Sequence, residues 1–265
     1  MQLDPIAVAA GVRLEVFASV GSTNKEARLR VLRGDMAPLW ITAVTQTDGR
    51  GRMDRSWASP SGNLYASLLL REPAAPERAP ELGFVAALAV RDAVIAEAAP
   101  LAAQLAFKWP NDLLLAGKKC AGILIEGEVD VDNRVSAVIG IGVNCASHPD
   151  NTAYPATDLA AHGAAVAPER LFRQLSAAMC RRLAMWDRGL AFSAILGDWL
   201  SAVSGLGEEI IVRNGSGEKR GRFVGLDPSG RLVLQTPAGA TEKISAGDVF
   251  PLDVHEQQRA ASRTD

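Results

Sequence analysis

The chain has 265 residues, of which 48% are hydrophobic, so it can bury one large core or one core with a small appended module. Its 28 basic and 30 acidic side chains give a net charge of −2. This balance argues against a general nucleic-acid-binding protein, and basic residues matter here only where they cluster.

The cysteines and the apolar stretches indicate in which cellular compartment the protein is located. Three cysteines (Cys120, Cys145 and Cys180) have no C-x-x-C spacing, which argues against a disulfide framework or structural zinc. The N-terminus has Asp4 and no basic start before a weak apolar stretch, so it is not a secretory signal. No stretch reaches the ~18–20 apolar residues that span a bilayer. We therefore expect a cytoplasmic protein without a membrane partner.

Helix-like and strand-like segments are mixed through most of the chain. Gly34 and Pro100 follow two of the expected helices and would end them. Short polar links between the last three strands suggest an antiparallel meander. The expected helices cover residues 22–33, 81–99 and 168–199 (the last one broken near Gly189), and the expected strands cover residues 40–45, 63–70, 106–115, 120–129 and 135–143.

The sequence changes character after Gly205. Short strands are expected here, separated by Asn-Gly, Pro-Ser-Gly and Pro-Ala-Gly turns, and this spacing suggests a small β-barrel. These strands cover residues 209–212, 220–226, 231–235 and 241–244. The expected domains are a catalytic or ligand-binding domain over residues 1–204, the barrel over 205–254 and a polar tail over 255–265.

The strongest local motif is Gly-Arg-Gly-Arg-Met-Asp-Arg-Ser-Trp at residues 49–57. Its glycines permit a close approach of the backbone to a ligand. Three arginines within six residues repel one another unless they meet anions, and guanidinium groups suit carboxylate and phosphate oxygens. Trp57 offers a flat face for a heterocycle. Alone, the motif also fits a solvated basic loop or a nucleic-acid-binding arm, although the net charge weighs against the arm.

A second cluster, Lys-Trp-Pro-Asn-Asp at residues 108–112, is followed by Lys119 and an apolar strand. Pro110 cannot continue a β-ladder, so polar groups are expected at a sheet edge. Asp112 could hold magnesium, because hard cations prefer carboxylate oxygens. Lys119 could neutralise charge that develops between a carboxylate and a phosphate. A hairpin with exposed lysines and an Asn-Asp turn is the alternative.

Two weaker motifs complete the set. Thr23 with Glu26 matches a capping box, and Ser22 could serve as N-cap, so both have a structural explanation. The same helix start offers N–H groups and hydroxyls to a polar ligand. The Gly-Ile-Gly-Val-Asn run at residues 140–144 lacks the third glycine and the helix of a dinucleotide fingerprint. Packing explains this run, or a flat ligand that lies on the strand.

In this order, the motifs resemble the biotin–protein ligase family. The matching pieces lie within residues 22–144, and the C-terminal strands extend the likeness to about residue 254. Gly-Arg-Gly-Arg and Lys-Trp-Pro-Asn-Asp are each fairly specific, and both are present. The full set is Ser22-Thr23-Asn24, Gln46, Gly49–Arg52, Arg55, Trp57, Ser59–Tyr65, Lys108–Asp112, Lys119, Gly122–Leu124, Gly140, Gly142 and Asn144.

The resemblance implies an α+β fold, with a mixed sheet and packed helices of the class II synthetase-like biotin/lipoate ligase type, then the small barrel. It implies ATP- and magnesium-dependent adenylation of biotin to biotinyl-5'-AMP, and transfer of biotin to a lysine of a biotin carboxyl carrier domain. Some members add an N-terminal helix-turn-helix that represses biotin genes. Because only 21 residues precede Ser22, we expect a ligase that binds no specific DNA. The oligomeric state stays open, with a homodimer among the alternatives.

The resemblance also assigns roles to residues. Biotin would contact Ser22, Thr23, Asn24, Gln46, Gly49, Arg50, Lys119, Gly122 and Gly140. ATP would contact Arg52, Arg55, Trp57 (stacked on adenine), Lys108, Asn111, Asp112, Lys119 and Asn144. Lys119, Arg50 and Asp112 would be catalytic. Arg50 and Lys119 would face the valeryl carboxylate and the α-phosphate, and Asp112 would help to hold magnesium.

Two acids depart from the pattern. Many members have a third glycine at the position of Asp54, and Asp48 adds another acid beside the loop, so the ordering of the loop stays open. Two other functions remain as alternatives. A lipoate–protein ligase shares the architecture and the adenylate chemistry but lacks this Gly-Arg loop. A non-catalytic biotin sensor could lose Lys119 or Asp112 at little cost.

Overall fold

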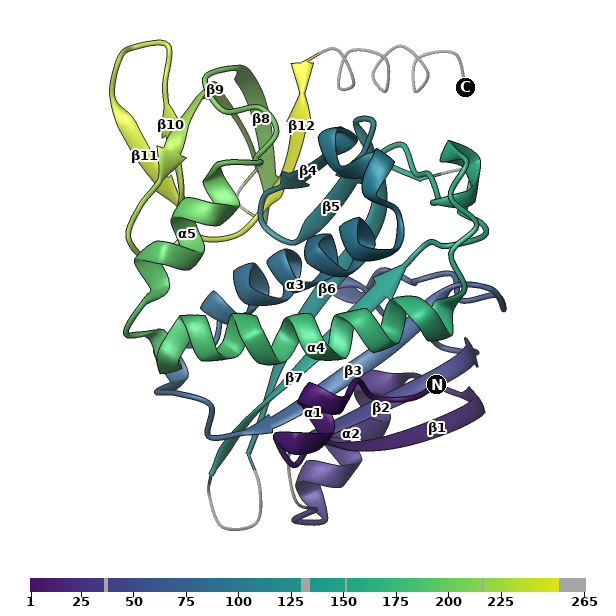
Figure 1. The fold of residues 1–265 in the computed structure, drawn as a ribbon. Coiled ribbons are helices and arrows are strands. Elements are labelled where there is room, and N and C mark those ends of the chain that lie inside the picture. Colours follow the sequence, from purple (N-terminus) through teal and green to yellow (C-terminus); the bar gives the residue numbers. More distant parts are fainter. Residues whose placement is uncertain (36–37, 130–133, 151, 216, 253–265) are drawn as a thin grey trace.

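A seven-stranded mixed sheet forms the larger part of the fold (Figure 1). The structure, a computed structural model, describes residues 1–35, 38–129, 134–150, 152–215 and 217–252; the expected tail at 255–265 lies outside them. The strand order is β1-β2-β3-β7-β6-β5-β4, with β1 and β2 parallel and the other pairs antiparallel. The strands are β1 (Arg13–Val20), β2 (Leu39–Gln46), β3 (Leu64–Arg71), β4 (Leu105–Lys108), β5 (Asp112–Leu115), β6 (Lys118–Val129) and β7 (Val135–Val143).

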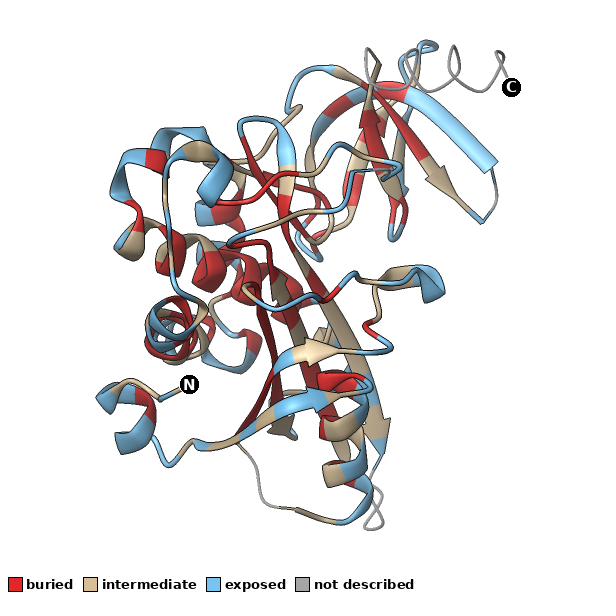
Figure 2. Ribbon diagram, turned by 90° about the vertical axis from the view of Figure 1, so that its right-hand side faces the viewer, coloured by how far each residue is buried: buried red, intermediate tan, exposed pale blue. Residues whose placement is uncertain are grey.

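Helices cover both faces of this sheet. On one face, α3 and α4 pack against each other and against the strands, and the buried residues concentrate there (Figure 2). On the other face, α2 packs on β2, β3 and β7 around a smaller apolar cluster. The α-helices are α1 (Pro5–Ala9), α2 (Thr23–Leu32), α3 (Glu81–Glu97), α4 (Pro168–Trp186) and α5 (Phe192–Leu200). Short 3₁₀ turns cover Arg52–Asp54, Pro76–Arg78, Ala99–Gln104, Ala160–His162 and Asp187–Gly189.

Side-chain alternation decides what each face carries. Along β3, Leu64, Ala66 and Leu68 enter the large core with α3 and α4, whereas Leu69 enters the smaller cluster with α2. Because successive side chains of a strand point to opposite faces, the intervening residues of β3, β6 and β7 also lie on the α2 face. That face therefore receives the glycines and polar residues of the motifs.

The C-terminal strands form a second, five-stranded antiparallel sheet in the order β11-β10-β9-β8-β12. The strands are β8 (Glu209–Asn214), β9 (Gly217–Leu226), β10 (Leu232–Gln235), β11 (Thr241–Ile244) and β12 (Asp248–Pro251). The expected C-terminal β-structure is confirmed, but within the described residues β11 and β12 are the two edges of an open sheet and no closed barrel is found.

Contacts at the β9–β10 turn join the two sheets. The buried indole of Trp109 donates a hydrogen bond from Nε1 to the carbonyl oxygen of Gly230, at 3.0 Å. Gly230 has φ +76, and a Cβ there would lie 2.7 Å from the ring of Phe84 on α3. The turn thus rests directly on α3 and on the segment that follows β4.

Most expected elements are present, but besides the open second sheet there is a correction in the large sheet. The strand expected at 106–115 is instead two strands, β4 and β5, that pair antiparallel with each other. The chain reverses at Trp109–Asn111 because Pro110 has no N–H for the ladder. The strands β1 and β12 and the helix α1 were not among the expected elements.

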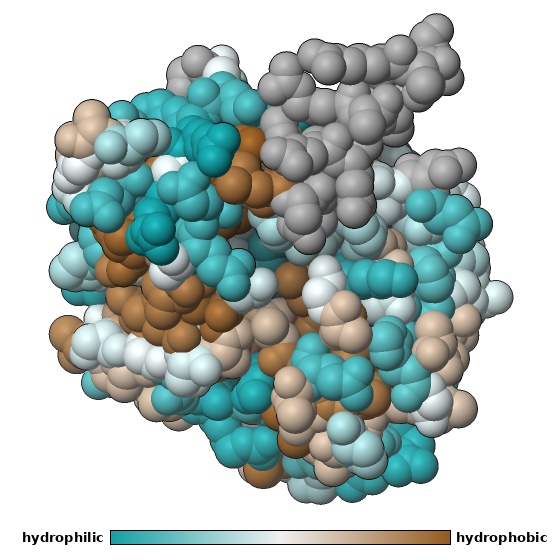
Figure 3. Space-filling view, turned by 90° about the horizontal axis from the view of Figure 1, so that it is seen from above, coloured by the Kyte–Doolittle hydropathy of each residue, from teal (hydrophilic) through white to brown (hydrophobic). Residues whose placement is uncertain are grey.

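None of the helices in the described part of the chain has the length and apolar character to cross a bilayer. The face seen from above is a mosaic of hydrophilic and hydrophobic side chains (Figure 3).

We expect Trp109→Phe to lower the free energy of unfolding by about 1–3 kcal/mol, because it leaves the buried carbonyl of Gly230 without its donor. Urea denaturation of the parent and the variant measures the difference. An unchanged midpoint and slope would show that this bond does not hold the two sheets together.

Candidate active site

A cavity of about 360 Å³ lies on the α2 face of the large sheet. Its walls come from the start of α2, the loop at 49–57, the loop at 149–156 and β12 of the second sheet. Among its lining residues are Ser22, Thr23, Asn24, Gln46, Arg50, Arg52, Arg55, Trp57, Tyr65, Lys108, Asn111, Asp112, Lys119, Gly122, Leu124, Gly140, Gly142, Asn144, Thr152, Tyr154, Asp248 and Phe250.

Two rows of paired residues on the α2 face form the cavity floor. The pairing in the first row runs from β3 to β5 through Tyr65, Gly142, Gly122 and Asp112. The pairing in the second row runs through Ser67, which does not line the cavity, and then through Gly140 and Leu124, which do. Strand register therefore places the separate glycine motifs side by side.

The glycines let other side chains lie directly on the sheet. A Cβ at Gly142 or Gly122 would lie 2.6 or 2.9 Å from the Trp57 ring, so the indole covers both residues. The ammonium of Lys119 is 5.3 Å from the centroid of this ring. The indole Nε1 of Trp57 is buried without a hydrogen-bond partner among the described residues. A buried, unpaired donor is costly, and it marks the position where a ligand acceptor would fit.

The start of α2 forms a polar wall. Ser22 is the N-cap residue, as one of the two sequence interpretations has it, although its side chain makes no capping hydrogen bond; Thr23 is the first residue of the helix, so the capping box of Thr23 with Glu26 is absent. The hydroxyl of Thr23 instead lies 3.1 Å from Gln46 Oε1, which also accepts from the Thr23 N–H at 2.9 Å. These side chains are turned toward the cavity rather than toward the end of their own helix.

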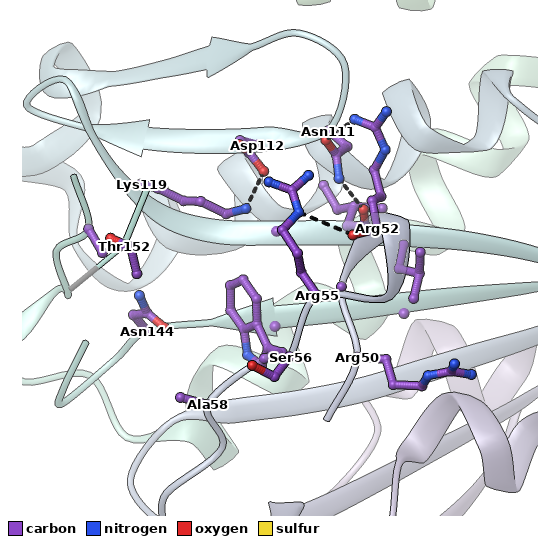
Figure 4. Close-up of a pocket in the computed structure, with 18 of the residues that line it drawn as sticks. Arg50, Arg52, Arg55, Ser56, Ala58, Asn111, Asp112, Lys119, Asn144 and Thr152 are labelled. Carbon is purple, nitrogen blue, oxygen red and sulfur yellow. Dashed lines mark hydrogen bonds and ion pairs between the residues drawn. The ribbon is translucent and has the colours of Figure 1, made fainter. Parts of the chain in front are cut away.

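A carboxylate between two lysines forms the charged end. The two oxygens of Asp112 lie 2.9 Å from Lys108 Nζ and 2.6 Å from Lys119 Nζ (Figure 4). The Lys119 contact is an ion pair at short range rather than a well-directed hydrogen bond. Burial by itself raises the pKa of Asp112, but Lys108 and then Lys119 outweigh it and hold that pKa well below its usual value. Asp112 is therefore ionised at neutral pH and is a weak base.

The arginines of the 49–57 loop form ion pairs and hydrogen bonds with other residues of the protein. Arg50 pairs with Asp54 at 3.0 Å, and Arg55 pairs with Asp248 of β12 at 2.9 Å. Arg52 donates to Asn111 Oδ1 at 3.0 Å, and burial lowers its pKa. The acid at the expected glycine position thus serves as a partner for an arginine of the loop.

Nearly all of the expected site residues are brought together. Gly49 is the exception: it does not line the cavity, and a Cβ there would lie 2.4 Å from the Trp57 carbonyl oxygen, so it supports the loop. Arg50 lines the cavity but points away from Lys119 and Asp112 (Figure 4). Asn144 donates to the Thr157 carbonyl at 3.0 Å and holds the following loop.

Several lining residues had no assigned role in the sequence. Tyr154 lies in the 149–156 loop, and Lys108 Nζ is 4.5 Å from its ring centroid. Asp248 and Phe250 come from the second sheet. Tyr65 belongs to a matching motif, and burial raises its pKa to about 12, which keeps the phenol neutral. Only Tyr65 carried a sequence signal; the others depend on how distant segments pack.

The donor set fits magnesium only together with a ligand. The described residues contain no group of three or more His, Cys, Asp or Glu side chains that could hold a metal. The cavity has two carboxylates, Asp112 and Asp248, and each already faces a cation. Magnesium commonly binds through one or two carboxylates plus substrate phosphates and water. A magnesium ion would therefore arrive with a nucleotide rather than occupy a preformed cage.

Comparisons with known proteins identify the family. A model described as "Biotin/lipoate A/B protein ligase family" matches residues 16–144, and one described as "Biotin protein ligase C terminal domain" matches residues 205–250. A biotin–[acetyl-CoA-carboxylase] ligase of Paracoccus denitrificans is 41% identical over 89% of this chain and 99% of its own length. The chain belongs to the biotin–protein ligase family.

Solved structures agree with this membership. A biotin protein ligase from Aquifex aeolicus in complex with biotin and ATP superposes with a TM-score of 0.74, at 26% identity, over 90% of this chain and 97% of the other. One from Leishmania major in complex with biotinyl-5-AMP gives a TM-score of 0.61, at 28% identity, over 88% and 99%. The mixed sheet with packed helices expected from the sequence is confirmed.

We expect Asp112→Asn to destabilise the fold by about 3–5 kcal/mol, because it leaves the buried ammonium of Lys108 beside Lys119 without a counter-ion. Denaturant unfolding at pH 7 measures this difference. The carboxyl pKa is lowered in the folded state, so its stabilisation is present above the unfolded pKa of about 3.9 and is lost as pH falls below it. The gap between the two proteins should therefore narrow below about pH 4. A gap that is constant with pH would contradict the ion-pair explanation.

Proposed function

We propose that this chain uses ATP to convert biotin into biotinyl-5'-AMP and transfers the biotinyl group to a lysine of a carboxylase carrier domain. One observation carries the proposal: a single cavity joins an uncharged polar wall to a cluster of cations. A polar heterocycle and an anionic pair of reacting groups can thus be held in one place. The Paracoccus relative, named a biotin–[acetyl-CoA-carboxylase] ligase, supports the same reaction.

The two ends of the cavity suit the two ends of biotin. We assign the ureido ring to the wall of Ser22, Thr23, Asn24 and Gln46, whose groups both donate and accept hydrogen bonds. The valeryl chain would cross the floor near the glycines and bring its carboxylate toward Lys119. The nucleotide would lie among the residues around the cation cluster, namely Arg52, Arg55, Trp57, Lys108, Asn111, Asp112 and Asn144.

Adenylation requires two anions to meet. A carboxylate oxygen of biotin attacks the α-phosphorus of ATP, the bond to the bridging oxygen of the β-phosphate breaks, and pyrophosphate leaves. Lys108 and Lys119 supply fixed positive charge at the place where negative charge accumulates. Asp112 holds both ammonium groups in position and keeps them from repelling each other. Magnesium, held by Asp112 and the phosphates, would add charge neutralisation.

Transfer then needs a neutral amine. The carrier lysine attacks the carbonyl carbon of the mixed anhydride, AMP leaves with its oxygen, and the amine loses a proton. The depressed pKa of Asp112 makes it a poor acceptor for that proton, so we assign it to charge placement rather than to base catalysis. Much of the rate of this step would come from positioning.

The setting of the reaction is also proposed. Free cysteines at positions 120, 145 and 180 support a reducing, cytoplasmic environment. The net charge of −2 supports a ligase that does not bind specific DNA.

Pyrophosphate release tests the function directly. The chain mixed with ATP, magnesium and biotin should release pyrophosphate and then label the lysine of an added carrier domain. Lipoate in place of biotin should give little of either product. Release with lipoate alone would support a lipoate ligase, and binding of biotin without any release would support a sensor.

We expect Lys119→Ala to lower the adenylation rate by several orders of magnitude, because it removes a cation at the reacting centre while Lys108 still pairs with Asp112. Single-turnover formation of biotinyl-5'-AMP measures the effect, and circular dichroism checks the fold. A variant that forms the adenylate at nearly the parental rate would refute this assignment.

We expect Arg52→Gly to speed the release of the adenylate by roughly tenfold to a hundredfold, because it removes one charge-assisted contact of about 1.5–3 kcal/mol. The freed anhydride should then label lysines of bystander proteins. Met53→Gly is the control for a glycine in the loop, since it places one beside Arg52 at an exposed side chain that carries no charge and at φ +53, which glycine adopts readily. Equal release rates in both variants would assign the effect to loop flexibility instead of charge.

A further inference from the structure

A chain of hydrogen bonds runs behind the polar wall to a glutamate outside the cavity. Glu126 Oε2 accepts from Asn24 Nδ2 at 2.7 Å, and Asn24 Oδ1 accepts from the buried Ser67 hydroxyl at 2.5 Å. Ser67 Oγ also lies 2.8 Å from Thr23 Oγ1. Glu126 is not a cavity residue, yet one hydrogen bond joins it to Asn24, which lines the cavity, and a second continues from Asn24 to Ser67.

Glu126, at the end of this series of hydrogen bonds, determines which group donates and which accepts in each of them. An ionised carboxylate only accepts hydrogen bonds, so the Asn24 atom that faces Glu126 must be the amide nitrogen. The carbonyl oxygen of Asn24 is then turned toward Ser67, and it takes the single hydroxyl hydrogen of that residue. The flat amide rests on Gly140, where a Cβ would lie 2.3 Å from Asn24 Oδ1.

The other amide of the wall is fixed from its own side. Gln46 Oε1 accepts the backbone N–H of Thr23 at 2.9 Å, and Gln46 Nε2 donates to Ser59 Oγ at 2.9 Å. The orientation of Gln46 therefore does not depend on Glu126. The orientation of Asn24 does, because its other partner, Ser67, is a hydroxyl that can either donate or accept.

The polar wall therefore presents a defined pattern of hydrogen-bond donors and acceptors to the ligand. The second hydrogen of Asn24 Nδ2 has no acceptor among the residues that the structure describes, and Asn24 lines the cavity. Thr23 Oγ1 donates to Gln46 and keeps lone pairs that can accept. A donor beside an acceptor matches a ligand carbonyl that is flanked by an N–H group.

We propose that Glu126 is a positioning residue that locks Asn24 with its N–H toward the ligand, and so selects a ureido carbonyl over a donor group at the same place. The proposal rests on the proposed function of the cavity. If Asn24 turned over, its carbonyl oxygen would face the ligand carbonyl and repel it. Holding one amide orientation thus acts as a specificity filter.

Another glutamate on the same strand, Glu128, is better placed than Glu126 for a purely structural role. Arg28 of α2 lies 2.6 Å from Glu128 and 3.5 Å from Glu126, so Glu128 makes the closer ion pair that ties α2 to β6. Among the described residues, Glu128 is hydrogen-bonded to Arg28 and not to Asn24. The two glutamates, two residues apart on the same face of β6, therefore separate anchoring of the helix from orientation of the amide.

The test compares Glu126→Gln with Glu128→Gln on biotin and 2-iminobiotin, whose guanidinium donates where biotin accepts. Glutamine can offer Asn24 either an N–H or a carbonyl, so Asn24 is no longer locked. Loss of negative charge alone would disfavour the cationic analogue, and both variants share that loss. Free rotation of the Asn24 amide favours binding of 2-iminobiotin, and only Glu126→Gln permits this rotation. The two explanations thus predict opposite changes in selectivity.

In Glu126→Gln we expect the KM for biotin to rise about tenfold, the KM for ATP and kcat to stay near the parental values, and the preference for biotin over 2-iminobiotin to shrink at least about tenfold. Glu128→Gln should keep or increase the preference. An unchanged or larger preference in Glu126→Gln would overturn the proposal, as would an equal decrease in both variants.

Calorimetric binding without ATP separates this inference from the proposed function. A parental chain that fails to bind biotin would refute the function of the cavity; a parental chain that binds biotin, with no change of selectivity in Glu126→Gln, would refute only the role of Glu126. If Glu126→Gln does not fold, Ser67→Ala gives the second reading. It removes the hydroxyl but leaves Glu126 to fix the Asn24 nitrogen, so the preference should stay near the parental value; a preference that shrinks in Ser67→Ala would assign the locking to Ser67 and overturn the proposal.

Discussion

The active-site cavity depends on three glycines in the strands of the large sheet, which leave room for other side chains on its surface. Gly122, Gly140 and Gly142 lie in adjacent rows of the sheet, and a Cβ at any of them would come within 2.9 Å of a neighbouring side chain. The indole of Trp57 and the amide of Asn24 can therefore rest on the backbone itself. Larger residues would fill the space from below, and the cavity between the sheet and α2 would close.

Charge compensation shapes the opposite end of the same cavity. Four of the basic groups there have a carboxylate partner: Asp112 pairs with two lysines, Asp248 with Arg55 and Asp54 with Arg50, whereas Arg52 donates to the Asn111 amide. An anionic ligand would therefore exchange partners with these carboxylates rather than meet bare cations. Such an exchange costs less reorganisation than gathering repelling charges after the ligand arrives. It also gives Asp54 a physical role where a glycine was expected.

The second sheet belongs to the site as much as to the fold. Its strand β12 contributes Asp248 and Phe250 to the cavity, and its β9–β10 turn rests on Trp109 and Phe84. The Lys-Trp-Pro-Asn-Asp motif thus faces both ways, with Asp112 in the cavity and Trp109 in the contact between the sheets. A shift of the second sheet would consequently be felt at the nucleotide end of the cavity.

The sequence by itself determined the elements that carry a local pattern. The helix over α3 ends before Pro100 and α2 ends before Gly34, because these residues act on the backbone next to them. Residues within contiguous motifs were recognised for the same reason. The edge strand β1 was not expected, since its burial is irregular along its length and leaves no period-two pattern. The sequence predicts one strand where β4 and β5 form a hairpin, because both halves are apolar.

Only the tertiary structure decided which distant groups meet. Asn24 and Glu126 are 102 positions apart, and Arg55 and Asp248 are 193 apart. Nothing in the local sequence of either partner encodes these contacts, because they follow from strand register and from the docking of one sheet on the other. Register assigns every second residue to one face, and a shift by one position would exchange cavity residues for core residues. The sequence therefore identified most of the chemical groups of the site. Tertiary packing alone determined their partners, their orientation and their charge state.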